Sequence, residues 1–146
     1  MKVKFLELKR LYGKFKQKNM NDHISDLLAR LQNGIMRKKE TIEVPKTKMI
    51  LEILKVLEQE NMIEAIEEME EGKIGVFPLY FEDETPVVEH FTRVSKPGQR
   101  IYVSSGDITP VLNGRGINII STSSGLMSGA MAKSKNIGGE LICRVW

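Results

Sequence analysis

Two stretches of the chain carry apolar residues at helical spacing. In the first, residues three and four apart form one stripe of an amphipathic helix, made up of Ile24, Leu27, Leu28, Leu31 and Ile35. Asn21 or Asp22 suits the start of this helix, and Gly34 lies near its end. In the second, Thr47 suits the cap, and the predicted buried stripe consists of Ile50, Ile53, Leu54 and Leu57. Each helix is therefore expected to bury one side.

Shorter apolar runs before and after the second helix predict strands. TIEVP ends at Pro45, and the runs IGVFPLYF and VVEHFTRV follow the helix. Pro78 has no amide hydrogen to donate, so its strand is expected to lie at a sheet edge or to carry a bulge. The acidic segment EAIEEMEEGK, which precedes these two runs, is interpreted as exposed helix and loop surface.

From Lys96 onward the chain changes to short apolar runs separated by Gly, Ser and Pro. RIYV, GINIIST and GELICRVW are predicted strands, with one or two helical turns between Leu126 and Lys133. This order of elements predicts an α+β fold, in which an N-terminal α/β lobe packs on a C-terminal β-rich lobe with short helices. The expected parts are a basic N-terminal extension (1–19), an N-terminal lobe (20–94) and a C-terminal lobe (95–146).

The composition is that of a folded, soluble protein of 146 residues, with 41% apolar and 28% charged residues. No apolar stretch approaches the roughly 20 residues that a membrane-spanning helix needs, and the opening segment lacks the apolar core of a secretory signal. Membrane insertion and export are therefore not expected. Cys143 is the single cysteine, so it cannot form an internal disulfide, and its apolar neighbours indicate a core thiol.

The net charge of +3 conceals a strong partition along the chain. Residues 1–39 have a balance of +8 and residues 93–146 a balance of +5, whereas residues 40–92 reach −10 from four basic and fourteen acidic side chains. Phosphate attracts Lys and Arg and repels carboxylates. A polyanion is therefore expected to meet the two ends of the chain and to avoid the middle.

The residues offer no convincing enzyme site. His23 and His90 are the only histidines, and Ser123 and Ser124 lack the Gly-x-Ser-x-Gly frame of a nucleophile elbow. The Gly-Arg-Gly of residues 114–116 precedes a strand instead of following one, which indicates a turn and not a dinucleotide-binding loop. We therefore expect no catalytic residue, no metal ligand, no cofactor and no small-molecule substrate.

A run of hydroxyl side chains rises above this background. Ser121 to Ser124 follow the strand core GINII, and Gly125 allows close approach of another backbone. Hydroxyls both donate and accept hydrogen bonds, which suits the phosphate oxygens, sugar 2′-hydroxyls and base edges of RNA. An ordinary turn explains the same residues. The basic C-terminal surroundings, together with Tyr102 as a side chain that can stack on a base, favour RNA.

Four segments, in this order, resemble the ribosomal small-subunit protein eight family: NDHISDLLARLQNG, RVSKPGQRIY, GRGINIISTSSGLMS and NIGGELICRVW. The resemblance runs from about Asn21 to Trp146. It implies a two-lobed α+β protein without catalytic activity, which binds small-subunit ribosomal RNA beside neighbouring small-subunit ribosomal proteins. Resemblance and charge together nominate the RNA-binding residues Ser121, Thr122, Ser123, Gly125, Tyr102, Gly139, Glu140, Arg93, Lys96, Arg100, Arg37, Lys38 and Lys39.

Roles differ within this set. The resemblance implies that the Ser121–Ser123 loop makes the main RNA contact and that Tyr102 flanks it, with Gly139 on the same surface. Glu140 either accepts hydrogen bonds from base amino groups or supports the loop. Arg93, Lys96 and Arg100 are expected to contact phosphates. Arg37, Lys38 and Lys39 either contact RNA or only complement the negative end of the first helix.

Three features depart from the family pattern. Residues 1–19 have no counterpart, residues 128–131 lack a frequent Asp-Arg pair, and the middle is acidic enough to suggest that it faces solvent or a basic protein. Two other functions remain open: a regulatory messenger-RNA-binding protein that uses the same surface, and an uncharacterised enzyme. The basic leader favours a ribosome of the mitochondrial matrix slightly over one of the bacterial cytoplasm.

Overall fold

The computed structural model describes residues 23–146 and confirms an α+β fold. The N-terminal lobe contains a first helix (23–36), β1 (Ile42–Pro45), α2 (Lys48–Gln59), β2 (Ile63–Met69), the turn η1 (Glu70–Gly72) and β3 (Lys73–Pro78). The C-terminal part contains β4 (Phe91–Arg93), β5 (Tyr102–Val103), the turns η2 (Ser105–Asp107) and η3 (Leu112–Gly114), β6 (Ile117–Thr122), β7 (Gly125–Ser128), α3 (Gly129–Ser134) and β8 (Gly139–Val145).

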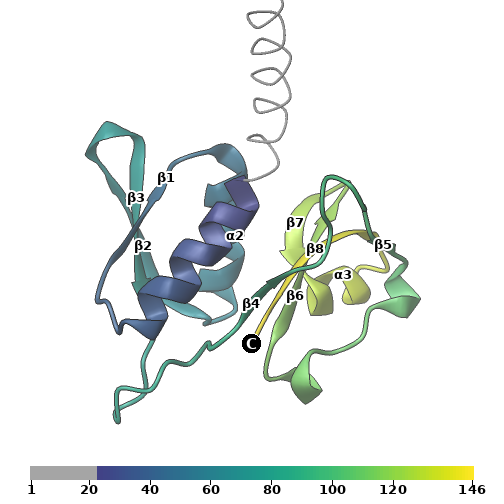
Figure 1. The fold of residues 1–146 in the computed structure, drawn as a ribbon. Helices are drawn as coiled ribbons and strands as arrows, with labels where there is room; N and C mark the ends of the chain where they lie inside the picture. Colours follow the sequence, from purple (N-terminus) through teal and green to yellow (C-terminus); the bar gives the residue numbers. More distant parts are fainter. Residues whose placement is uncertain (1–22) are drawn as a thin grey trace, which may run out of the picture.

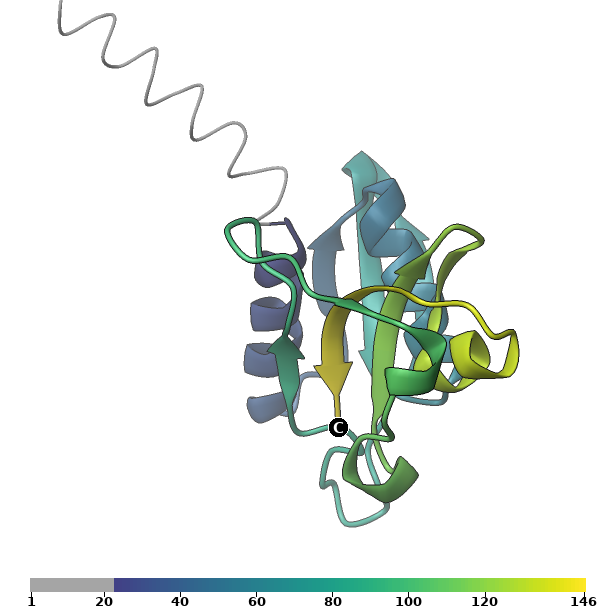
Figure 2. The same ribbon diagram turned by 90° about the vertical axis from the view of Figure 1, so that its right-hand side faces the viewer.

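The strands form two antiparallel sheets. A three-stranded sheet has the order β1-β3-β2, and a five-stranded sheet has the order β4-β8-β6-β7, with β5 also paired to β8. The first helix and α2 lie between the two sheets (Figure 1), and the view turned by 90° has the second sheet in front of the N-terminal lobe (Figure 2). Because β4 pairs with β8, residues 91–93 belong to the second sheet. The lobe boundary near residue 95 stays a prediction.

One apolar cluster joins the two lobes. It contains the predicted stripes of both helices, together with Val44 and Val76 of the first sheet and Ile119 and Cys143 of the second. A smaller cluster under α3 includes Ile120 and Leu141. Residues 119 and 120 thus point to opposite faces of β6, as a strand requires. The second sheet therefore has apolar side chains packed on both of its faces.

Local signals account for the second helix. Thr47 caps α2 by accepting a hydrogen bond from the amide of Ile50 at 3.1 Å, as predicted. Ile50, Ile53 and Leu57 are fully buried. The predicted caps of the first helix, Asn21 and Asp22, and the basic extension 1–19 lie outside the residues that the structure describes.

The carboxylates of the acidic segment are exposed and residues 70–72 form the turn η1, as predicted, but no part of the segment is the expected α-helix. Residues 64–69 belong instead to β2, an edge strand that pairs with β3. Glu has a low preference for strands, but Ile63 and Ile66 pack into the core beside α2, and this packing outweighs the local preference. Of the two alternatives predicted for Pro78, the sheet edge is wrong, because Pro78 ends the central strand β3. The irregularity is found: the register shifts where Pro78 and Phe77 pair with β2, between Ile63 and Ala65.

Two further boundaries differ from the prediction. Of the run VVEHFTRV only Phe91–Arg93 is a strand, and these residues pair with Cys143–Val145 of β8. Val94 still donates its amide to Ile142 of β8 but lies beyond the paired residues. The helical turns expected from Leu126 begin at Gly129 instead, since residues 125–128 pair with β6 as β7. Alternation of apolar residues does not reveal where a distant partner strand stops.

Candidate nucleic-acid interface

One row of the second sheet brings three predicted residues together. Tyr102 of β5 pairs with Glu140 of β8, and Glu140 pairs on its other side with Ser121 of β6. Directly opposed residues of antiparallel strands project from the same face of a sheet. The next row, Ile120 with Leu141, faces the opposite way into the cluster under α3. Tyr102, Glu140 and Ser121 therefore share the face that looks away from α3.

The hydroxyl loop, which consists of residues 121–124, extends this row at the β6–β7 hairpin. Thr122 pairs with Gly125 across a two-residue turn, and Gly125 has a φ of 106°, a conformation that favours glycine. The Thr122 hydroxyl donates to the Gly125 carbonyl at 2.8 Å and accepts from the Ser124 amide at 3.1 Å. This side chain therefore supports the turn itself.

The two neighbouring serines differ from Thr122. Within residues 23–146, the hydroxyls of Ser121 and Ser123 make no hydrogen bond, and Ser123 is exposed. Tyr102 is also exposed, with 70% of its surface accessible. The row thus ends in an accessible aromatic ring and two hydroxyls that are available to a ligand.

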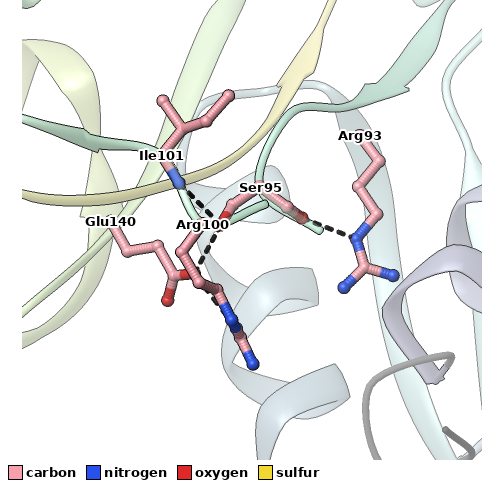
Figure 3. A network of polar contacts seen from close by, with 5 residues as sticks. All are labelled: Arg93, Ser95, Arg100, Ile101 and Glu140. Atoms are coloured by element: carbon pink, nitrogen blue, oxygen red, sulfur yellow. Dashed lines mark hydrogen bonds and ion pairs between the residues drawn. The ribbon is translucent and has the colours of Figure 1, made fainter. Parts of the chain in front are cut away.

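Glu140 is held by donors of the protein (Figure 3). Its Oε2 accepts from the Ser95 hydroxyl at 2.5 Å and from Arg100 Nη1 at 3.1 Å. Its side chain is 16% exposed, compared with 42% for Arg100. The Ser95 hydroxyl in turn accepts from the Ile101 amide at 3.2 Å. These contacts hold the carboxylate against Ser95 and Arg100, so both predicted roles of Glu140, support of the Ser121–Ser123 loop and contact with a base, stay predictions.

The predicted cations lie in different environments. Arg93 is half-buried, and its guanidinium donates to the Ser95 carbonyl at 2.8 Å and to the Ser25 hydroxyl of the first helix at 2.5 Å. Arg100 is paired with Glu140. Lys96 is exposed in a tight turn closed by backbone hydrogen bonds with Gln99. Lys96 and Arg100 therefore lie at the surface beside the row, whereas Arg93 connects β4 to the first helix.

The second basic group is separate from this row. Arg37, Lys38 and Lys39 follow the C-terminal end of the first helix, whereas Ser25, which contacts Arg93, is near its other end. Twelve helical residues span about 18 Å. Arg37 and Lys39 line a groove of about 500 Å³. The structure therefore does not bring this basic group to the hydroxyl loop.

Sequence reasoning missed Ser95 and Gly138. Ser95 is 2% exposed and is the centre of the polar network around Glu140. Gly138 and Gly139 are needed because other strands approach them closely: an added Cβ would lie 2.4 Å from the Val103 carbonyl oxygen and 2.1 Å from that of Ser121, respectively. The Gly-Gly pair before a strand was the available signal for close approach, and Ser95 had none beyond its place before the Lys-Pro-Gly turn.

Cys143 is the single cysteine of the chain and forms no disulfide. Cys143 is completely buried, and this burial raises the pKa of its thiol to about 12, so the thiol stays protonated at neutral pH. Among residues 23–146, no three His, Cys, Asp or Glu side chains gather in a way that could hold a metal ion. Over the same residues, no helix is long and apolar enough to cross a membrane.

A family model described as ribosomal protein S8 matches residues 22–146. The chain belongs to the ribosomal protein S8 family. Similar proteins named small ribosomal subunit protein uS8 come from Enterococcus faecalis, 45% identical over 130 residues that cover 87% of this chain and 98% of the relative, and from Caulobacter vibrioides, 41% identical over 88% and 99%. The protein of the same name from Lactococcus lactis is 42% identical over 130 residues, which cover 87% of this chain and 98% of the relative. These S8 relatives are bacterial.

Proposed function

We propose that the chain is a structural constituent of the small ribosomal subunit and binds small-subunit ribosomal RNA directly, through the end of its second sheet. The observation that carries this proposal is the row of Tyr102, Glu140 and Ser121 with the adjoining Ser123 turn. Membership of the S8 family supports the ribosomal role. The surface acts by recognition, and the proposal includes no reaction.

The chemistry of the row matches RNA in three ways. An exposed tyrosine ring can stack on an unpaired base. The hydroxyls of Ser121 and Ser123 can bond to 2′-hydroxyls and base edges, for which their lack of charge is no obstacle. Lys96 and Arg100 lie beside them and can neutralise phosphates. Thr122 and Gly125 set the shape of the turn, and Gly139 the approach of its strand.

The acidic middle supports a division of surfaces. Exposed carboxylates of β2 and of the turn that follows it, among them Glu67, Glu68 and Glu71, belong to the three-stranded sheet and its hairpin, whereas the hydroxyl loop belongs to the other sheet, beyond the helices (Figure 1). RNA phosphates would be repelled there. We infer that the RNA approaches from the second sheet, while the acidic side faces solvent or a basic protein of the same subunit.

The compartment of the ribosome, mitochondrial matrix or bacterial cytoplasm, is a separate proposal. The leader of residues 1–19, with its seven basic residues and single Glu, favours the mitochondrial matrix slightly, whereas the relatives named above are bacterial. Arg37, Lys38 and Lys39 are proposed as a second RNA contact, independent of the row.

Equilibrium binding to the small-subunit ribosomal RNA of Enterococcus faecalis tests the function. The full chain should prefer this RNA to the large-subunit ribosomal RNA of the same organism, and log affinity should fall linearly with log salt. Lys96→Gln should reduce the magnitude of that slope by about 0.7–0.9. Lys55→Gln, an exposed lysine of α2, is the matched control and should leave it unchanged. Equal affinity for both RNAs would contradict the proposal.

A further inference from the structure

Ser95 is a buried polar residue whose three polar groups are all engaged. Its amide donates to the carbonyls of Leu141 and Ile142, at 3.1 and 3.3 Å. Its carbonyl accepts from Arg93, and its hydroxyl donates to Glu140 while accepting from Ile101. With 2% of its surface exposed, Ser95 cannot itself touch a large ligand such as RNA.

These contacts form a continuous path across the molecule. Arg93 joins Ser95 to Ser25 of the first helix, and Glu140 joins Ser95 to the row that also holds Tyr102 and Ser121. Figure 3 shows Ser95 in the middle, with Arg93 on one side and Glu140, Arg100 and Ile101 on the other. The path therefore connects the N-terminal lobe to the predicted RNA-binding surface.

We propose that Ser95 is a positioning residue for the RNA interface and acts through Glu140 and Ile101. Its hydroxyl holds the Glu140 side chain from one side and the backbone entering β5 from the other. Tyr102, the next residue after Ile101, is thereby kept in register with Glu140 and, across β8, with Ser121. This inference rests on the proposed function, and it assigns to Ser95 the role of keeping Tyr102, Glu140 and Ser121 aligned for RNA binding.

The same contacts explain why a carboxylate is present there. An uncompensated Glu140 would repel phosphate, but Arg100 neutralises it and Ser95 directs its hydrogen bonds into the protein. Glu140 then serves to hold Ser95 and Arg100 in place and does not read a base. The surface offered to RNA consists of the uncharged hydroxyls and the tyrosine ring, framed by Lys96 and Arg100.

Ser95→Ala tests this role in the full chain, with the Enterococcus faecalis small-subunit ribosomal RNA as the probe. The loss of one positioning hydrogen bond should weaken binding about fivefold, without changing the salt slope, because no cation is removed. Hydrogen exchange of the Ile101 amide should become faster, since its acceptor is gone. Wild-type affinity for Ser95→Ala would overturn the proposal.

Ser128→Ala is the matched control. Ser128 is also buried, at 3% exposure, and its hydroxyl caps α3 by accepting from the Met131 amide. This variant should lower Tm while binding RNA as tightly as the wild type. If both variants weaken binding equally, the effect of Ser95 is general destabilisation and the positioning role is wrong.

A double-mutant cycle separates positioning from direct contact. If Glu140 acts only with Ser95, the variants Ser95→Ala and Glu140→Gln should each weaken binding about fivefold, and the double variant also about fivefold. Losses that multiply to about 25-fold would mean that Glu140 contacts RNA independently, which overturns the proposal.

Two outcomes keep the test decisive. If Ser95→Ala does not fold, Glu140→Gln alone should weaken binding and speed exchange of the Ile101 amide together; weaker binding with unchanged exchange would refute the role of Ser95. If the wild-type chain itself shows no preference for small-subunit ribosomal RNA, the proposed function fails. A failure confined to the variants, with the wild-type preference intact, refutes only the role of Ser95.

Discussion

At the scale of single residues, the hydroxyl loop contains side chains with different tasks. The Thr122 hydroxyl bonds within the turn: it donates to the Gly125 carbonyl and accepts from the Ser124 amide. Ser121 and Ser123 have no such partner within the described range. The two explanations of the loop, an ordinary turn and an RNA contact, therefore apply to different residues of the same loop.

We expect opposite results from replacing Thr122 and Ser123. Thr122→Val should lower the free energy of unfolding by about 1 kcal/mol, because it removes internal hydrogen bonds. Ser123→Ala should leave Tm unchanged and lower RNA affinity about tenfold, because polar RNA atoms lose a partner. Thermal unfolding and RNA binding, measured on both variants, check this. Unchanged RNA binding by Ser123→Ala would show that the whole loop is an ordinary turn without a role in RNA binding.

The buried thiol predicts a dependence of stability on alkaline pH. Burial raises the pKa of Cys143 to about 12 from an ordinary value of 9.0, although the charge of Arg93 acts in the opposite direction. Between these values the unfolded chain loses the proton and the folded chain keeps it. Stability should therefore fall as pH rises through this window, by at most about 1.4 kcal/mol per pH unit from this group.

Cys143→Val isolates that contribution, because valine fills a similar apolar space and cannot ionise. The difference in free energy of unfolding between wild type and variant, measured in urea from pH 8 to pH 11, should be constant below pH 9 and should shift in favour of the variant above it. A difference that does not change with pH would show that the thiol ionises equally in both states.

At the scale of elements, the interface depends on how closely β8 lies beside β6. Gly139→Ala would put a Cβ 2.1 Å from the Ser121 carbonyl oxygen, so one strand must move. We expect a loss of roughly 1–3 kcal/mol in the free energy of unfolding, as for overpacking of a tight site. Gly106→Ala, with no atom within 4 Å of the added Cβ, should change stability by less than about 0.5 kcal/mol in the same urea titration.

At the scale of the whole molecule, the charge partition predicts which side RNA covers. Residues 40–92 have a balance of −10 and residues 93–146 a balance of +5. In the complex with small-subunit ribosomal RNA, acylation of Lys96 should slow several-fold, while that of Lys55 and Lys73 should stay at the rate of the free protein. Mass spectrometry of the labelled chain measures each site. Equal protection of all three lysines would refute this orientation.

The sequence by itself determined the features that depend on neighbouring residues. The spacing of Ile50, Ile53 and Leu57 and the cap at Thr47 identified α2, because a helix closes its hydrogen bonds within four residues. The order of an α/β part followed by a β-rich part was indicated by the helical spacing of apolar residues before residue 95 and by the short apolar runs between Gly, Ser and Pro after it. The motifs around GINIISTSSG indicated the family. The hydroxyl loop was visible for the same reason, since its residues are adjacent.

Only the tertiary structure decided which distant residues meet. β2 forms in an acidic segment because β3 and α2 offer it pairing and burial, which outweigh the weak strand preference of Glu. Ser95 and Glu140 are 45 positions apart and still share a hydrogen bond, and Tyr102 meets Glu140 only through the register of β5 on β8. Strand register depends on partner strands that lie far away in the sequence. The sequence therefore indicated the interface residues one by one, and only folding brings them together on one surface.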